Sequence, residues 1–207
     1  MKSLVTGGNG FIGSMLVDRL IELGHEVVVI DNLSATCHDQ FYYNDRATYH
    51  HLNICDFKAT LPLYKDIDYV FHLAAYAAEG LSPFIRVFNY ENNLLVTASI
   101  VNNCIKHNVK RLVFTSTLAV YGHGVGGYFK EEQVPMPIDP YGVAKFGCEM
   151  DLQIAGEQHG LDWCIIRPHN VYGVKQNIWD KYRNVLGIWM YQYLNNESMT
   201  IFGDGTQ

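Results

Sequence analysis

Tyr141 and Lys145 are the two side chains whose types and spacing most directly suggest chemistry. They lie four residues apart in the segment PYGVAK, and on a helix this spacing places both on one face, one turn apart. An ammonium group beside a phenol favours the phenolate and lowers the phenol pKa, which makes tyrosine a usable general base near neutral pH. The same spacing is common on exposed helices, and the chain contains 14 tyrosines, so the pair needs further support.

A hydroxyl group upstream could complete this pair. The apolar run 111–115 is typical of a buried strand, and Ser116 and Thr117 follow it directly. In a parallel sheet the carboxyl ends of the strands face the crevice that binds ligands. Thr117 could therefore hydrogen-bond both the Tyr141 phenol and a substrate oxygen.

The segment TGGNGFIG (6–13) lies between an expected strand and an expected helix. Its glycines allow a tight turn, let backbone N–H groups approach a pyrophosphate, and let the helix pack closely on the strand. The helix N-terminus adds partial positive charge for the anion. The alternative is a glycine turn that only caps the helix.

Asp31 closes the second expected strand, about 20 residues beyond the glycine loop, as in dinucleotide-binding proteins. A carboxylate there can accept hydrogen bonds from both ribose hydroxyls, and it repels the 2′-phosphate of NADP. The order of strand, loop, helix, strand and acid therefore predicts a domain that binds NAD.

Short apolar runs alternate with helical patterns along the chain. The expected strands are at 3–6, 27–30, 69–73, 111–115 and 163–166, and the expected helices at 11–23, about 83–107, 141–159 and near 181–195. This alternation implies right-handed crossovers and a parallel sheet with helices on both faces. We expect an α/β doubly wound parallel sheet of the Rossmann type, with strand order 3-2-1-4-5-6 and room for an extra strand. Residues 1–175 would form the NAD-binding domain, and residues 176–207 the start of a smaller substrate-binding region.

Bulk properties exclude several classes of protein. Of the 207 residues, 48% are hydrophobic and 17% are charged, with a net charge of −6, which indicates a folded globule without the basic surface that nucleic acids or anionic membranes require. No apolar run is long enough to span a bilayer. The five cysteines show no CxxC spacing and indicate reduced, mostly buried thiols in a cytoplasmic protein. His50, His51 and His72 lack further ligands at metal spacing, so we expect packed or surface histidines and no metal.

The chain resembles the extended short-chain dehydrogenases/reductases, and within them the nucleotide-sugar epimerases of the UDP-glucose 4-epimerase type. The resemblance extends over nearly the whole length. The matching segments are TGGNGFIG (6–13), VVVIDNL (27–33), VFHLAA (70–75), NYENN (89–93), TSTLAVYG (115–122), PYGVAK (140–145), RPHNVYG (167–173) and TIFGDG (200–205).

The resemblance implies NAD as the cofactor. The residues that it implies around NAD are Gly7, Gly10, Phe11, Ile12, Gly13, Asp31, Asn32, Asn53, Ile54, Leu73, Ala74, Ala75, Asn93, Thr115, Tyr141, Lys145 and Pro168. Asn53 stands where the family usually carries an aspartate against the adenine amine, and its amide oxygen can still accept that hydrogen bond.

The resemblance also implies a reaction. Tyr141 would remove the proton from the sugar O4 while hydride passes from C4 to the nicotinamide, and hydride would return to the other face of the 4-keto sugar. The implied catalytic residues are Thr117, Tyr141 and Lys145, with Ser116 as the second candidate for the hydroxyl. The implied substrate-binding residues, for a UDP-sugar above all, are Thr117, Asn170, Asn184, Thr200 and Phe202. Glu79 is a further candidate, because it follows the fourth expected strand, where ligand-facing loops gather.

One feature separates the epimerases from the similar 4,6-dehydratases, which place an Asp-Glu pair directly after the catalytic threonine. Leu118 and Ala119 occupy those places here and can supply neither the acid nor the base that elimination of water needs. Epimerases of uronates and of hexosamines remain open, as does the nucleotide base.

Family members continue beyond a TIFGDG-like strand into a smaller domain whose arginines clamp the diphosphate, whereas this chain ends at Gln207. We therefore expect either a fragment of a longer polypeptide or a short protein that lacks much of its sugar-nucleotide site. Lys181 and Arg183 are more typical of a solvated helix surface than of a replacement clamp. A 4-ketosugar reductase and a non-catalytic NAD-binding protein are the alternative functions, and the helices near 83–107 and 141–159 are the expected homodimer contact.

Overall fold

The computed structural model describes residues 1–34, 40–77, 79–124, 128–179 and 184–205. The predictions for Cys37, Lys181 and Arg183 concern residues outside these ranges.

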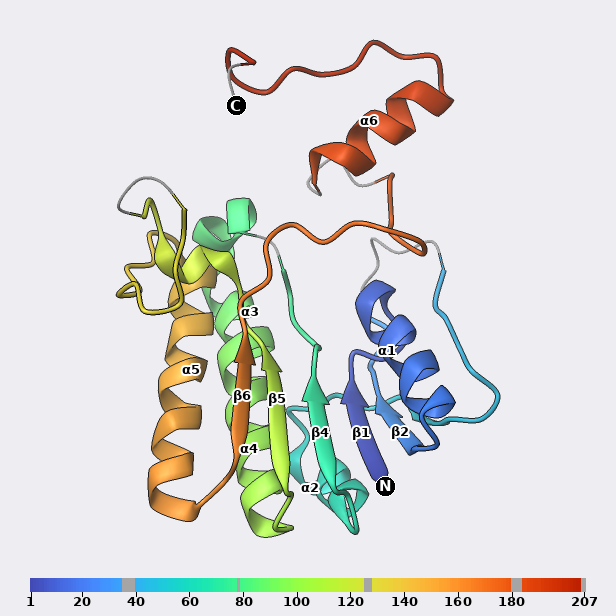
Figure 1. Cartoon of the computed structure of the whole chain (residues 1–207), viewed down its shortest axis with the longest axis vertical. Coiled ribbons are helices and arrows are strands. Elements are labelled where there is room, and N and C mark those ends of the chain that lie inside the picture. Colours follow the sequence, from blue (N-terminus) through green and yellow to red (C-terminus); the bar gives the residue numbers. More distant parts are fainter. Residues whose placement is uncertain (35–39, 78, 125–127, 180–183, 206–207) are drawn as a thin grey trace.

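Six parallel strands form a single sheet in the order β3-β2-β1-β4-β5-β6 (Figure 1). The strands are β1 (Lys2–Thr6), β2 (Glu26–Ile30), β3 (Thr48–His50), β4 (Tyr69–His72), β5 (Arg111–Thr115) and β6 (Trp163–Ile166). The doubly wound fold and its strand order are thus confirmed. Only β3 was not located by the sequence pattern, because it has three residues and none of them is fully buried.

The extra strand was not found, since the described residues form no seventh strand. The segment TIFGDG, which resembles a strand of the family members, consists of irregular chain and a turn here, with exposed residues from Thr200 to Gly205. An isolated segment without a neighbouring strand has no partner for its backbone groups and cannot form a ladder.

Apart from the short α2, which the sequence pattern did not predict, the helices lie close to their expected positions. They are α1 (Phe11–Glu22), α2 (Phe57–Thr60), α3 (Arg86–Tyr90), α4 (Val96–Lys106), α5 (Pro140–His159) and α6 (Val185–Leu194), with 3₁₀ turns η1 (Leu61–Tyr64), η2 (Glu79–Phe84) and η4 (Leu118–Tyr121) and a π-helical turn η3 (Glu91–Leu95). The helix expected over 83–107 begins only at Arg86, because Pro83 lies inside η2 and Ile85 leaves the helical conformation at φ −130°. From Arg86, α3, η3 and α4 follow one another without a break.

Two apolar cores cover the two faces of the sheet. Val5 and Val29 pack against α1 on one face, whereas Leu4 and Leu112 pack against α4 and α5 on the other. This division follows from the alternation of side chains along each strand. The face that carries α1 is towards the viewer in Figure 1.

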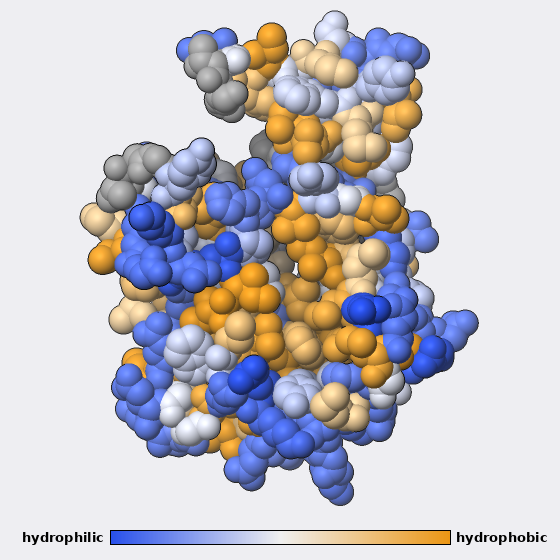
Figure 2. All heavy atoms as spheres, viewed as in Figure 1, coloured by the Kyte–Doolittle hydropathy of each residue, from blue (hydrophilic) through white to orange (hydrophobic). Residues whose placement is uncertain are grey.

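Helices cover both faces of the sheet, as expected, but β6 at the edge of the sheet is partly exposed on one of them. Trp163 and Ile165 pack against the larger core, but Cys164 and Ile166 point to the other face and are exposed. Figure 2 shows apolar surface in this part of the molecule. Cys164 is therefore an exposed thiol, whereas Cys104 and Cys148 are buried as expected.

The parallel strands end at one edge of the sheet, which is uppermost in Figure 1. The segments that follow β1, β4, β5 and β6 meet there, and α6 lies beyond them. The division of the chain near residue 175 stays a prediction. No helix within the described ranges has the length and apolar character needed to cross a membrane.

Candidate cofactor and catalytic site

Two glycines of the loop after β1 are required by the fold itself. Gly7 has φ +72°, and a Cβ there would lie 2.7 Å from the backbone nitrogen of Ala74. A Cβ on Gly13 would lie 2.1 Å from the carbonyl oxygen of Gly7. The loop can therefore pack against α1 and the exit of β4 only if both positions lack a side chain.

Gly10 is different, because the folded chain leaves room for a methyl group there. Its φ of −84° suits any residue, and its Cβ would lie 3.5 Å from the nearest atom, the oxygen of Gly7. Gly10 caps α1 without a side-chain hydrogen bond, and no acidic side chain lies in the first turn. The first-turn amides, from Phe11 to Gly13, remain available to an anion. This cradle fits a pyrophosphate group.

Asp31 joins the end of β2 to this cradle. Its Oδ2 accepts a hydrogen bond from the backbone nitrogen of Asn9 at 3.1 Å, and its Oδ1 accepts one from that of Leu33 at 2.9 Å. Each carboxylate oxygen keeps a further acceptor site, so both can still bind ribose hydroxyls. Asn32, at its side, is exposed and accepts a hydrogen bond from the Ser34 backbone.

The two residues expected near the adenine, Asn53 and Ile54, differ in how exposed their side chains are. Asn53 is exposed, and its amide oxygen accepts a hydrogen bond from the Cys55 backbone at 3.0 Å. Ile54 turns its side chain into the larger core, and its carbonyl accepts a hydrogen bond from Ser99 Oγ at 3.1 Å. Because the side chain of Ile54 is buried, any contact of this residue with NAD would be made by its backbone, and its place at the cofactor stays a prediction.

The segment after β4 lies against the glycine loop. The Ala74 nitrogen donates to Thr6 Oγ1 at 3.3 Å, and Leu73 precedes it, while Ala75 is exposed. Asn93 is buried and donates from Nδ2 to the Tyr76 carbonyl at 3.2 Å, which holds this segment in place. The Asn93 Oδ1 has no hydrogen-bond partner within the described chain.

His72 is the packed histidine that the sequence predicts. Its Nδ1 lies 2.8 Å from Thr6 Oγ1 and its Nε2 lies 3.0 Å from Thr97 Oγ1. Burial, and then the charge of Lys145, hold the pKa of His72 well below its usual range. The ring is therefore neutral at physiological pH.

Tyr141 and Lys145 share one face of α5, as their spacing predicts. Asp139 caps this helix, and its side chain accepts hydrogen bonds from the backbone nitrogens of Tyr141 at 2.9 Å and Gly142 at 3.0 Å. Lys145 is buried, and its Nζ donates to the Thr115 carbonyl at 2.9 Å. The same Nζ lies 5.9 Å from the centre of the Tyr141 ring.

The two hydroxyls after β5 are clearly distinguished by their surroundings. Ser116 is buried, and its Oγ donates to the carboxylate of Glu149. Thr117 is half-buried, caps η4, and accepts a hydrogen bond from the Ala119 backbone at 3.1 Å. Because the Ser116 hydroxyl is held inside the core, Thr117 remains the candidate for contact with a substrate. The Pro168 carbonyl beside it accepts a hydrogen bond from Leu118 at 3.2 Å.

Burial lowers the pKa of Lys145 to about 8, although the charges of Cys148 and Glu149 act in the opposite direction. The unfolded chain has a lysine pKa near 10.5, so between pH 8 and 10.5 the unfolded state binds more protons than the folded state. Stability therefore rises with pH in this window. The side chain is still an ammonium group at pH 7.

We expect the Lys145→Met variant to lack the rise in stability with pH that the buried Lys145 causes. For the NAD-free parent, the free energy of unfolding should gain up to about 3 kcal/mol from this lysine between pH 8 and 10.5. Urea unfolding of both proteins at pH 8, 9 and 10 measures the difference, because most other titrating groups are common to both. Parallel pH profiles would contradict the burial of a titrating ammonium group.

The side chains expected to bind the substrate lie on separate elements of the structure. Glu79 lies in η2, where burial and then the charge of Asp139 raise its pKa, and Asn170 is exposed. Asn184 caps α6 and accepts a hydrogen bond from the Gly187 backbone at 3.1 Å. Thr200 Oγ1 accepts a hydrogen bond from Gln192 Nε2 of α6 at 2.7 Å, and Phe202 is exposed.

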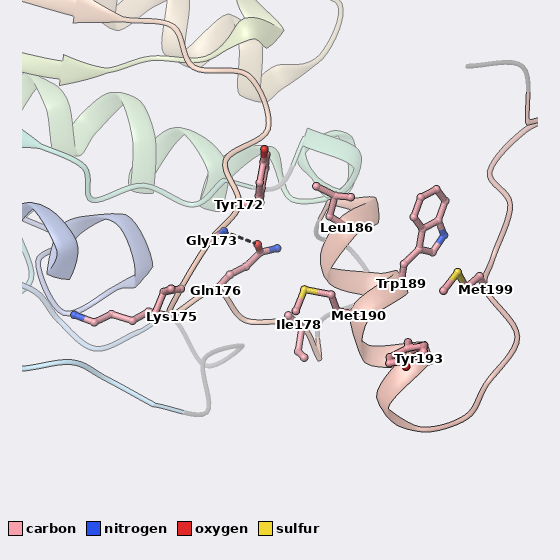
Figure 3. A pocket seen from close by; sticks show the side chains of 11 residues that line it. Tyr172, Gly173, Lys175, Gln176, Ile178, Leu186, Trp189, Met190, Tyr193 and Met199 are labelled. Carbon is pink, nitrogen blue, oxygen red and sulfur yellow. Dashed lines mark hydrogen bonds between the residues drawn. The ribbon is translucent and has the colours of Figure 1, made fainter.

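An apolar cavity of about 650 Å³ lies between α6 and the segment that leads to it (Figure 3). Tyr172, Trp189 and Met190 are among its lining residues, whereas none of the expected catalytic or substrate-binding residues lines it. In Figure 3 the Lys175 side chain points towards α1, where its Nζ lies 2.9 Å from Asp18 Oδ2. This contact fastens the segment before α6 to the glycine-loop helix.

Sequence reasoning missed the ion pair between the buried Glu149 of α5 and the partly buried Arg167, with Arg167 Nη2 2.6 Å from Glu149 Oε2. The available signal was the spacing of Tyr141, Lys145 and Glu149, which recur every four residues. A carboxylate on the buried face of a helix indicates a paired charge.

The profile of the NAD dependent epimerase/dehydratase family matches residues 3–207. The UDP-glucose 4-epimerase of Halalkalibacterium halodurans is 35% identical over 182 residues, which cover 86% of this chain and 53% of that protein. The chain thus spans only about half the length of this relative.

Solved structures of UDP-glucose 4-epimerases are also similar to this chain. The UDP-glucose 4-epimerase of Thermotoga maritima, solved with UDP-glucose, has a TM-score of 0.92 and 36% identity, and the match covers 99% of this chain and 67% of that one. The UDP-glucose 4-epimerase of Thermus thermophilus, solved with NAD, has a TM-score of 0.88 and 31% identity, and the match covers 97% of this chain and 65% of that one.

Proposed function

The chain belongs to the NAD-dependent epimerase/dehydratase family, and from that premise we propose that it epimerises C4 of a nucleotide sugar of the UDP-glucose/UDP-galactose type. The observation that carries the proposal is the joint placement of Tyr141, Lys145 and Thr117. The first two share a face of α5, and the third follows the strand whose last carbonyl binds Lys145.

NAD is the cofactor of this family, and the glycine cradle with Asp31 fits it. The first-turn amides of α1 would hold the pyrophosphate, and Asp31 would accept hydrogen bonds from the adenosine ribose. Bound NAD supplies reversible hydride transfer at the sugar C4.

The protein's own side chains would carry out the transfer of the O4 proton. Tyr141, as phenolate, takes the proton from the sugar O4 and returns it after the 4-keto sugar has turned over. The Thr117 hydroxyl donates a hydrogen bond to O4, and the Lys145 ammonium stabilises the negative charge of the phenolate. Since the hydride and the proton both return to the sugar, the reaction has no net redox change.

Leu118 and Ala119 support epimerisation over dehydration. Both follow Thr117 in η4, and Ala119 is buried. Neither side chain can give or take a proton, so elimination of water would lack the acid and the base that it needs.

An NMR assay of the NAD-loaded chain with UDP-glucose, and separately with UDP-galactose, tests the proposal. We expect each sugar to give the other until both mixtures reach one ratio, without accumulation of NADH. Steady formation of NADH, or of a dehydrated sugar, would contradict the proposal.

We also propose a homodimer through α3, η3, α4 and α5. Among these neighbouring elements, α3, η3 and α5 carry large apolar side chains that are exposed in the single chain, such as Val87, Leu95, Val143, Met150 and Ile154. Exposed apolar surface of this extent is typical of an interface.

The Ile154→Glu variant should be monomeric at concentrations at which the parent is a dimer, because a charge would be buried without a partner. Sedimentation velocity measures both states. The Leu23→Glu variant is the control, since Leu23 is similarly exposed but follows α1. A monomeric parent, or an Ile154→Glu dimer, would contradict this interface.

A further inference from the structure

A buried carboxylate joins α5 to the ends of two strands. Glu149 is 0% exposed and lies two helical turns after Tyr141. Its Oε1 accepts hydrogen bonds from Arg167 Nε at 2.9 Å and from Ser116 Oγ, and its Oε2 accepts one from Arg167 Nη2 at 2.6 Å. One side chain of α5 thus holds residues that follow both β5 and β6.

The segments that follow β5 and β6 remain paired beyond the strands. The Ser116 nitrogen donates to the Ile166 carbonyl at 2.8 Å, and the Leu118 nitrogen donates to the Pro168 carbonyl at 3.2 Å. Thr117 lies between the two donors along the chain, and Arg167 lies between the two acceptors. Glu149 therefore holds the side chain that directly precedes Thr117 and the side chain of Arg167 on the neighbouring segment.

The free-energy cost of burying the Glu149 carboxylate indicates a specific role for this residue. A buried carboxylate is tolerated only when it is paired, and apolar side chains of similar size often pack as well or better. Arg167 supplies the pairing through two nitrogens, which fixes direction as well as distance. Its Nη1 also donates to the Tyr121 hydroxyl at 2.7 Å, at the far end of η4. Both ends of the turn that Thr117 begins are thereby held.

We propose that Glu149 and Ser116 are positioning residues, which fix the Thr117 hydroxyl relative to Tyr141 and Lys145 without touching the substrate. α5 carries the proton-accepting pair, the chain after β5 carries the hydroxyl, and Glu149 connects the two. This inference rests on the proposed epimerisation for its kinetic consequence, but not for its structural one.

Three variants separate positioning from general stability. Ser116→Ala removes the link to β5 and leaves the Glu149–Arg167 pair intact. Glu149→Gln keeps the shape and removes the charge. Asp162→Asn is the matched control, because Asp162 pairs with Arg111 at the opposite end of the same two strands, in an exposed position.

The first readout is the methyl resonance of Thr117 in the NAD-loaded chain labelled with ¹³C-methyl threonine. Its disappearance in Thr117→Ser identifies it. We expect it to move or broaden in Ser116→Ala and Glu149→Gln, and to keep its position in Asp162→Asn. An unmoved resonance in Ser116→Ala overturns the inference, and this variant decides if Glu149→Gln does not fold.

The second readout is kinetic. Ser116→Ala should lower kcat about 10- to 100-fold, the scale expected for a misplaced catalytic group, and change KM by less than about threefold. In a Thr117→Ala background the same change should cost no further activity, because the hydroxyl that it positions is absent. An equal loss in both backgrounds overturns positioning through Thr117.

The two readouts also separate this inference from the proposed function. If the parent converts neither sugar but the Thr117 resonance moves, the epimerase proposal fails and the positioning holds. If the parent converts both sugars and the resonance does not move, the positioning fails and the epimerase proposal holds.

Discussion

The Tyr141→Phe variant should lose turnover, with kcat lowered about 1,000-fold or more, while it stays folded. Removal of the phenol oxygen takes away the only atom that the proposed mechanism uses to accept the O4 proton, and general acid–base catalysis by one side chain contributes about 10²- to 10⁴-fold. The phenyl ring keeps its place on α5, so packing changes little. The interconversion of UDP-glucose and UDP-galactose, followed by NMR, measures the loss.

Tyr128→Phe is the matched control for this change. It removes the same atom from a tyrosine that is 96% exposed, and its turnover should equal that of the parent. Thermal unfolding and NAD titration of both variants show whether a lost activity has another cause. A Tyr141→Phe variant that retains a tenth of the parent's kcat would contradict the assignment of Tyr141 as the base.

Alanine at Gly10 and at Gly13 should have two distinct effects on NAD binding. At Gly13 the new methyl group would lie 2.1 Å from the Gly7 oxygen, so the loop must shift. We expect a lower melting temperature, an overpacking cost of about 1–3 kcal/mol, and NAD affinity weakened about 100-fold or more. At Gly10 the nearest atom lies 3.5 Å away, so the fold should lose only about 0.5–1 kcal/mol, the cost of alanine in place of glycine at an N-cap.

The Gly10→Ala variant should nevertheless bind NAD about tenfold or more weakly, because its methyl group would point into the space assigned to the pyrophosphate. Calorimetric titration of cofactor-depleted protein, with a thermal melt of each variant, gives both quantities. If Gly10→Ala binds NAD as tightly as the parent, the pyrophosphate does not lie over Gly10 and the cradle is assigned wrongly. If Gly13→Ala melts at the parent's temperature, the close contact with Gly7 is not a constraint.

Much of the fold and the main features of the site could be predicted from local spacing. Apolar periodicity located five of the six strands, and it located α1 and α5 to within one residue at each end. The four-residue interval between Tyr141 and Lys145 was enough to place both on one face. These features follow from the backbone geometry of a few consecutive residues, which the sequence specifies directly.

Contacts between distant parts of the chain decided the rest. The resemblance ranked Thr117 before Ser116 after β5, and Glu149, 33 residues further on, supplies the physical reason because it holds Ser116 in the core and leaves Thr117 half-buried. The short β3 forms because β2 offers it an edge, and Ile54 turns inward because α4 covers that face of the sheet. β6, at the other edge of the sheet, has one exposed face although its sequence is as apolar as that of a buried strand. The sequence alone therefore determined which residues could do chemistry, whereas packing between remote segments decided which of them face a ligand, since burial and hydrogen-bond partners depend on neighbours in space.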